Sequence, residues 1–348
     1  MITIGGKNIG RTEKPFIIAE MSGNHNQSLK RALKIVDLAA EAGADALKLQ
    51  TYTPDTMTLD IHTGEFLIES DTNLWKGNSL YNLYKEAYTP WEWHKAIFER
   101  CQEHGMIAFS SPFDETAVDF LEMLNVPAYK IASFENIDIP LIKKVAATGK
   151  PVIISTGMAT IAEIDEAVRA VRSQGNNQIV LLKCTSTYPA APERSNITTI
   201  PHLREVFNTE VGLSDHTMGI GTAVAAVALG ATVIEKHFTI SRAEGGVDAT
   251  FSLEPHELRL LVEETDRAWR SLGRIQYGPS DTEKPSLEHR RSLYIGEDVK
   301  AGDILTKENI RIIRPGHGLE PKYFELVLGK TVKKDAAKGT PLDWELLL

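Results

Sequence analysis

The chain has 348 residues, of which 42% are hydrophobic and 24% are charged, and this composition excludes a disordered or collagen-like chain. A net charge of −9 without a Lys/Arg cluster argues against binding to nucleic acid or to a membrane surface. The sequence has no apolar run of the roughly 18 residues that a membrane span needs and no CxxC pair, and its first 16 residues lack the continuous apolar region of a secretory signal. We therefore expect a cytoplasmic protein without a disulfide framework.

Short apolar segments recur along the chain, and each is followed by a helical pattern. We predict strands at 16–22, 44–51, 106–112, 127–133, 151–157, 179–186, 210–216 and 232–239. We predict helices at 28–43, from about Pro140 to Gly149, after a capping box of Thr160 and Glu163, and at 254–272. Apolar strands that alternate with helices indicate a parallel sheet, and eight such units indicate a (β/α)8 TIM barrel in the α/β class. A doubly wound open sheet is the alternative, but no Gly-rich fingerprint follows the first strand.

The remaining segments differ from these units. Residues 52–90 are too long for a plain connection, so we predict a decorated loop near the active face. Residues 277–289 have the composition of a linker. Short strands predicted within 292–299, 310–316 and 331–336 indicate a small β-rich module. The predicted domains are thus a barrel (1–276), a linker (277–289) and a module (290–348).

Polar residues stand at the carboxyl end of every predicted barrel strand. In a barrel these ends meet at one mouth, where catalytic groups gather. We therefore predict an active site drawn from Glu20, Lys48, Gln50, Ser110, Ser111, Lys130, Ser133, Glu135, Ser155, Thr156, Thr185, Ser186, Tyr188, Ser214, Asp215, His216, Lys236 and His237.

Two histidines end consecutive strands, so His216 and His237 are candidates to bind one divalent metal. The alternative is that each hydrogen-bonds a neighbouring backbone group. Two histidine ligands, with Glu20 as a nearby carboxylate, leave coordination positions open, which suits a catalytic ion.

Two lysines, Lys48 and Lys130, interrupt apolar strands. A buried ammonium group needs an anionic partner, which is either a carboxylate of the protein or a phosphate or carboxylate of a ligand. The strand-end serines are hydroxyl donors that suit a phosphate cradle. Arg314, in the RPGHG segment, is interpreted from the residues alone as part of a structural turn.

Nine ordered segments resemble a known family. FIIAEMSGNHNQ, ALKLQTY, SSPFD, AYKIASFENID, IISTGM, KCTSTYP, GLSDHTMGIG, IEKHFT and RPGHGL resemble the sialic acid synthase family of phosphoenolpyruvate-dependent sugar-acid synthases. The resemblance spans essentially the whole chain and implies a TIM barrel with a C-terminal SAF (antifreeze-like) domain. The forms MSGNHNQSL, SFENIDIPLI, KCTSTYPA and SRAEGGVD resemble the pseudaminic acid branch more than the N-acetylneuraminate branch.

The resemblance implies a transferase that condenses phosphoenolpyruvate with the open-chain aldehyde of an amino sugar. It assigns phosphoenolpyruvate binding to Lys48, Ser111, Lys130, Ser133, Ser155 and Ser214, where the family has Thr in place of Ser111. It places Glu20, Gln50, Tyr188 and Asp248 near the sugar and the metal-bound water, and Glu135 near the reacting carbon. The family has Asn where Ser186 stands, so we expect the substrate contact at this position to shift. It implies Mn²⁺ or Mg²⁺ on His216 and His237 without an organic cofactor. It also implies a domain-swapped homodimer, in which Arg314 of one subunit reaches the barrel of the other.

Two other functions remain as alternatives. One is a Schiff-base aldolase that uses Lys48, Lys130 or Lys236. The other is a non-catalytic sugar-binding protein whose C-terminal module is the functional surface.

Overall fold

The structure, a computed structural model, describes residues 2–69 and 74–348. By internal contacts the chain divides into two units, Met1–Gly273 and Arg274–Leu348. Each unit has a hydrophobic core of its own. Within the described residues no helix is both long enough and apolar enough to cross a bilayer.

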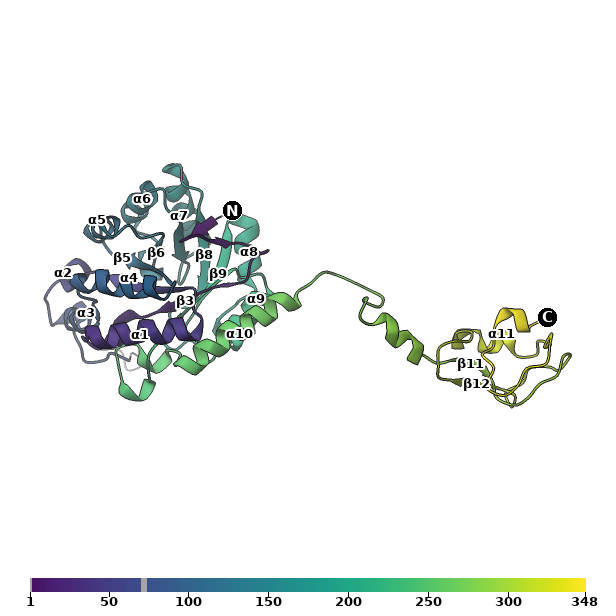
Figure 1. The fold of residues 1–348 in the computed structure, drawn as a ribbon. Coiled ribbons are helices and arrows are strands. Elements are labelled where there is room, and N and C mark those ends of the chain that lie inside the picture. Colours follow the sequence, from purple (N-terminus) through teal and green to yellow (C-terminus); the bar gives the residue numbers. More distant parts are fainter. Residues whose placement is uncertain (1, 70–73) are drawn as a thin grey trace. The chain divides into compact units, whose positions relative to one another are not determined.

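The first unit is a closed barrel of eight parallel strands, as predicted (Figure 1). Each strand pairs with the next along the chain, and the last pairs with the first. The barrel strands are β3 (Phe16–Glu20), β4 (Ala46–Thr51), β5 (Ile107–Pro112), β6 (Tyr129–Ile131), β7 (Val152–Ser155), β8 (Ile179–Cys184), β9 (Glu210–Asp215) and β10 (Val233–His237).

Helices follow the strands and cover the outside of the barrel. They are α1 (Leu29–Ala42), α4 (His94–Glu103), α5 (Glu115–Met123), α6 (Ile139–Ala147), α7 (Ile161–Ser173), α8 (Thr199–Phe207), α9 (Gly221–Ala228) and α10 (Pro255–Ser271). The residues predicted to begin or end two of these helices do so. Helix α1 ends at Gly43, whose φ of 91° favours glycine, and Thr160 and Glu163 form the capping box of α7.

Two features of the barrel unit were not predicted. A hairpin of β1 (Ile2–Ile4) and β2 (Lys7–Ile9) precedes the barrel, and its three-residue strands are too short to show a periodic pattern. The segment predicted as a decorated loop contains α2 (Pro54–Met57) and α3 (Leu80–Ala87), which lie together at one side of the barrel (Figure 1). Residues 70–73 of that segment lie outside the described residues.

The second unit is small and β-rich. Strands β11 (Ser292–Ile295) and β12 (Ile310–Ile313) pair antiparallel, and a short helix, α11 (Phe324–Val327), follows. The strand predicted at 331–336 is wrong, because these residues form only isolated bridges. The bridges run to three separate segments, at Ile304, Leu347 and Val299, so no continuous ladder forms.

Candidate active site

A cavity of about 380 Å³ is lined by residues at the carboxyl ends of the barrel strands. Most residues predicted for the site line this cavity, namely Lys48, Gln50, Lys130, Ser133, Glu135, Ser155, Tyr188, Ser214, His216, His237 and Asp248. The closed barrel explains the convergence, because it brings the ends of all eight strands to one face.

Nine of the predicted residues do not line the cavity: Glu20, Ser110, Ser111, Thr156, Thr185, Ser186, Asp215, Lys236 and Arg314. Glu20 and Ser111 contact the ammonium group of Lys48. Lys48 Nζ lies 2.5 Å from Glu20 Oε2 and 3.2 Å from Ser111 Oγ. Ser186 lies beside Cys184, with 3.9 Å between hydroxyl and sulfur. Arg314 follows β12 and belongs to the second unit, so the barrel unit does not contain it.

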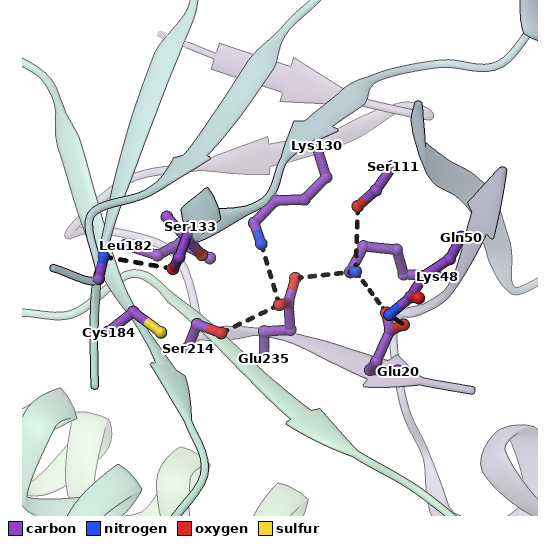
Figure 2. Close-up of polar contacts among 12 residues, drawn as sticks. Glu20, Lys48, Gln50, Ser111, Lys130, Ser133, Leu182, Cys184, Ser214 and Glu235 are labelled. Atoms are coloured by element: carbon purple, nitrogen blue, oxygen red, sulfur yellow. Dashed lines mark hydrogen bonds and ion pairs between the residues drawn. The ribbon is translucent and has the colours of Figure 1, made fainter. Parts of the chain in front are cut away.

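Figure 2 shows a row of alternating charges, of which Lys48, Glu235 and Lys130 form the floor of the cavity and Glu20 lies at one end. Lys48 lies between Glu20 and Glu235, and Lys130 Nζ is 3.1 Å from Glu235 Oε1. Strand register explains the first pair, because Glu20 on β3 is the direct partner of Lys48 on β4. The lysines that interrupt apolar strands thus have carboxylate partners within the protein.

Burial and charge act against each other in this row. Burial acts to lower the pKa of Lys48, but the carboxylates of Glu20 and Glu235 outweigh it and raise the pKa. At Lys130 burial outweighs Glu235, and the pKa is lowered. Burial acts to raise the pKa of Glu235, but the two lysines lower it. An anionic ligand that enters the cavity therefore competes with Glu20 and Glu235 for ammonium groups that are already buried.

Glu235 was not predicted from the sequence. It precedes His237 by two residues on β10, and side chains two apart on a strand lie on the same face. The alternation of side chains between the two faces of β10 therefore places Glu235 beside His237 at the barrel interior, and this signal was available in the sequence. Tyr52, Tyr84 and Cys184, which also line the cavity, were likewise absent from the prediction.

The two histidines face one another, with 5.3 Å between ring centroids. His216 Nδ1 lies 3.0 Å from the carbonyl oxygen of Thr185, which can only accept, so in the neutral ring Nδ1 carries the proton and Nε2 has the lone pair. His237 Nδ1 is buried without a hydrogen-bond partner and lies 3.9 Å from Asp248 Oδ2. Burial first, and then the charge of His216, lower the pKa of His237 far below its ordinary value. The neutral ring of His237 can therefore offer a lone pair to a cation. Burial acts to lower the pKa of His216, but the hydrogen bond and charge of Cys184 outweigh it and raise the pKa, so His216 binds a cation only after Nε2 has lost its proton.

Residues 2–69 and 74–348 include no cluster of three or more His, Cys, Asp or Glu side chains suited to hold a metal. A divalent ion at this position would have two imidazole ligands from the protein. Its other coordination positions would be left to water and substrate. The orphaned nitrogen of His237 fits such an ion.

Ser133 and Ser155 line another part of the cavity, and Gly157 lies beside Ser133. Ser155 Oγ is buried and has no hydrogen-bond partner, whereas Ser133 Oγ accepts from the backbone N–H of Gly157 at 3.2 Å. A Cβ at position 157 would lie 2.2 Å from Ser186 Oγ and 2.7 Å from Ser133 Oγ. Only glycine permits these hydroxyls to approach the backbone so closely.

Glu135 has the properties of a proton-transfer group. It ends the short helical turn that follows β6, and its Oε2 atom is buried without a hydrogen-bond partner. Burial raises its pKa to about 7. A carboxyl group with this pKa exchanges protons readily near neutral pH.

Lys236, one of the Schiff-base candidates, does not line the cavity. Its ammonium group is buried, lies 2.8 Å from Asp215 Oδ2 and donates to the carbonyl oxygen of Thr217 at 2.7 Å. It alternates with Glu235 and His237 on β10, so it points away from the barrel interior. This geometry argues against Lys236 as a nucleophile in the site.

Comparison with known proteins agrees with this geometry. Residues 35–277 match the NeuB family and residues 290–348 match the SAF domain. The chain is 44% identical to pseudaminic acid synthase of Campylobacter jejuni (96% of this chain, 97% of the relative), and 41% identical to pseudaminic acid synthase of Helicobacter pylori (95% and 97%). Among solved structures, N-acetylneuraminic acid synthetase of Leptospira borgpetersenii is similar with a TM-score of 0.74 and 34% identity (83% of this chain, 95% of that chain). The chain belongs to the NeuB family, and it carries a C-terminal SAF domain.

Proposed function

We propose that the protein is a pseudaminic acid synthase. It condenses phosphoenolpyruvate with the open-chain form of 2,4-diacetamido-2,4,6-trideoxy-β-L-altropyranose, and the products are pseudaminic acid and phosphate. The relatives named pseudaminic acid synthase match nearly the full length of the chain and support this choice of branch. The single observation that carries the chemistry is a pair of buried lysines beside two facing imidazoles in one cavity.

The lysines and hydroxyls suit phosphoenolpyruvate, which carries a carboxylate and a phosphate. Lys48 and Lys130 supply charge, and Ser155 offers a hydroxyl that has no partner within the protein. Charge-assisted hydrogen bonds at close range in a buried site are strong, so the net charge of −9 on the whole chain does not oppose binding. We propose that Ser111, Ser133 and Ser214 also contact phosphoenolpyruvate.

The reaction forms one bond between carbons and breaks one C–O bond. Carbon 3 of phosphoenolpyruvate attacks the aldehyde carbon, whose oxygen takes up a proton. Water adds to the positive carbon 2 and loses a proton, which forms a new C–O bond. The C–O bond to phosphate then breaks, phosphate leaves with the electron pair, and the added hydroxyl loses its proton to form the carbonyl group of the product. We assign the proton transfers to Glu20 and Glu135, and the pKa of about 7 at Glu135 suits a group that gives and takes protons near neutral pH.

We assign the metal to His216 and His237, as Mn²⁺ or Mg²⁺. When bound there, a divalent ion supplies Lewis acidity toward the aldehyde oxygen. We place the sugar near Gln50, Tyr188 and Asp248, and we assign Ser186 to substrate binding. Gln50 Nε2 donates to Glu20 Oε1 at 3.1 Å, which orients the amide toward the floor of the cavity.

We further propose a domain-swapped homodimer, in which Arg314 from the SAF domain of a partner subunit completes the sugar site. The resemblance of the RPGHGL segment supports this proposal. The exposed apolar side chains Phe134, Ile137 and Met158, which follow β6 and β7, support an interface on this face of the barrel.

The test is phosphate release from phosphoenolpyruvate in reactions that lack one component each. Phosphate should appear only when the diacetamido-trideoxy sugar, phosphoenolpyruvate and Mn²⁺ or Mg²⁺ are all present. Turnover of N-acetylmannosamine that equals or exceeds that of this sugar would overturn the choice of branch in favour of an N-acetylneuraminate synthase. Sugar binding without any turnover would support the binding-protein alternative, and borohydride trapping of a lysine adduct would support the aldolase.

A further inference from the structure

One wall of the cavity is apolar, in contrast to its charged floor. The segment that includes α2 and α3 supplies most of this wall, and Phe113 after β5 adds to it. The apolar lining includes Tyr52, Met57, Ile68, Leu80, Leu83 and Phe113.

Helix α3 presents one apolar face to the cavity. Leu80, Leu83, Tyr84 and Ala87 all line it, and their spacing of i, i+3, i+4 and i+7 places them on one stripe of the helix. Asn82 and Lys85 lie on other faces and are exposed. The stripe therefore borders space that a ligand can occupy, in addition to packing the segment onto the barrel.

The position of α3 is fixed by contacts at both ends. Ser79 caps the first turn, and Gln27 Nε2 donates to the carbonyl oxygens of Glu86 and Tyr88 at 2.9 and 2.7 Å. A Cβ at Gly23 would lie 3.1 Å from the Cα of Ala87, so glycine at this position permits close approach of the helix end. The apolar wall is thus preformed, which suits selection of a ligand by shape and polarity.

We propose that the α3 stripe binds the C6 methyl group of the sugar and thereby selects a 6-deoxy sugar over its 6-hydroxy counterpart. This inference rests on the proposed function. A methyl group against Leu80 and Leu83 gains from burial. A hydroxyl at the same place loses its water and finds no hydrogen-bond partner among these leucines. Apolar pockets discriminate between groups of this size by about 10- to 200-fold.

The test compares two sugars on three proteins. The sugars are 2,4-diacetamido-2,4,6-trideoxy-altrose and the same compound with a hydroxyl on carbon 6. The proteins are the wild type, Leu83→Asn and the control Asn82→Ala, which changes an exposed side chain one residue away on the same helix. For each protein the ratio of kcat/KM for the two sugars and the KM for phosphoenolpyruvate are measured.

In the wild type and in Asn82→Ala, kcat/KM should be about tenfold or more higher for the deoxy sugar than for the hydroxy sugar. Leu83→Asn should lower this ratio of kcat/KM values by about tenfold and leave the KM for phosphoenolpyruvate unchanged. An unchanged ratio in Leu83→Asn, with wild-type turnover of the deoxy sugar, would overturn the inference and leave the proposed function intact. No turnover of either sugar by the wild type would overturn both. If Leu83→Asn does not fold, Leu80→Asn, whose side chain is only partly buried, carries the same test.

Discussion

Glu235 lies between Lys48 and Lys130 in the row of alternating charges. The substitution Glu235→Gln removes its negative charge and keeps nearly the same side-chain shape. Glu235 is 5% exposed, and its carboxylate accepts from Lys130 Nζ and Ser214 Oγ at 3.1 Å each and lies 4.0 Å from Lys48 Nζ. Loss of one partner from a buried ion pair costs about 3 to 5 kcal/mol. Because the amide oxygen of glutamine still accepts a hydrogen bond, we expect the free energy of unfolding to fall by about 3 kcal/mol, at the lower end of that range.

The same substitution should strengthen binding of phosphoenolpyruvate. In the wild type this anion competes with Glu235 for the ammonium group of Lys130, and the variant lacks that competitor. We expect binding tighter by about tenfold, which corresponds to about 1.4 kcal/mol. Urea unfolding followed by circular dichroism gives the stability, and calorimetric titration with phosphoenolpyruvate in the absence of sugar gives the affinity.

A second buried ion pair provides the matched control. Asp215→Asn breaks the pair of Lys236 with Asp215, which points away from the cavity, so it should lower stability without tightening phosphoenolpyruvate binding. Stability of Glu235→Gln within about 0.5 kcal/mol of the wild type, or weaker binding of phosphoenolpyruvate, would refute the reasoning.

The pH dependence gives a further check on Glu235→Gln. The pKa of Lys130 in the folded wild type lies below its ordinary value of 10.5, because burial outweighs Glu235. Between the two pKa values the unfolded chain binds more protons than the folded one, so stability rises with pH in this window. Without Glu235 the folded pKa falls further and the window widens, so the stability deficit of the variant should narrow as the pH rises toward 10.5.

Further predictions concern the metal, the glycine, the buried acid and the second unit. His237→Ala should abolish binding of Mn²⁺ in calorimetric titration, and unchanged binding would contradict the ligand assignment. Gly157→Ala should raise the KM for phosphoenolpyruvate by about tenfold or more, because its methyl group would displace the hydroxyl of Ser133, and a normal KM would show that this contact is not used. The pKa of Glu135 is raised to about 7, so the folded state binds more protons than the unfolded state from about pH 4.5 to 7, and this contribution to stability is lost as the pH rises through 7. Glu135→Gln should therefore raise the Tm relative to the wild type more at pH 8 than at pH 5, and equal shifts would argue against the raised pKa. Arg314→Ala should raise the KM for the sugar and leave phosphoenolpyruvate binding unchanged, whereas full activity of a chain that ends at residue 280 would contradict the swapped dimer.

The sequence by itself determined the barrel and most of its mouth. Eight apolar segments that alternate with helical patterns define strands whose carboxyl ends must meet, because a closed parallel barrel has only one such face. Local signals at helix ends were equally informative, as Gly43 after α1 and the capping box of Thr160 and Glu163 at the start of α7 show. Residues at strand ends, such as Lys48, Lys130 and His237, could thus be assigned to one cavity without coordinates.

Only the tertiary structure decided which of these groups contact one another. Lys130 and Glu235 are 105 residues apart in the chain and come from strands that are not neighbours in the barrel, so no local pattern pairs them. The orphaned Nδ1 atom of His237 depends in the same way on what surrounds it in space.

The same reasoning explains the elements that sequence patterns missed or misassigned. Helix α3 spans only Leu80–Ala87, and its apolar stripe gains meaning only from the cavity that it borders. The segment 331–336 has the composition of a strand, but its residues bridge to three separate partners. Periodicity reports on which face of an element is buried, whereas the partner that covers this face is set by the packing of the whole chain.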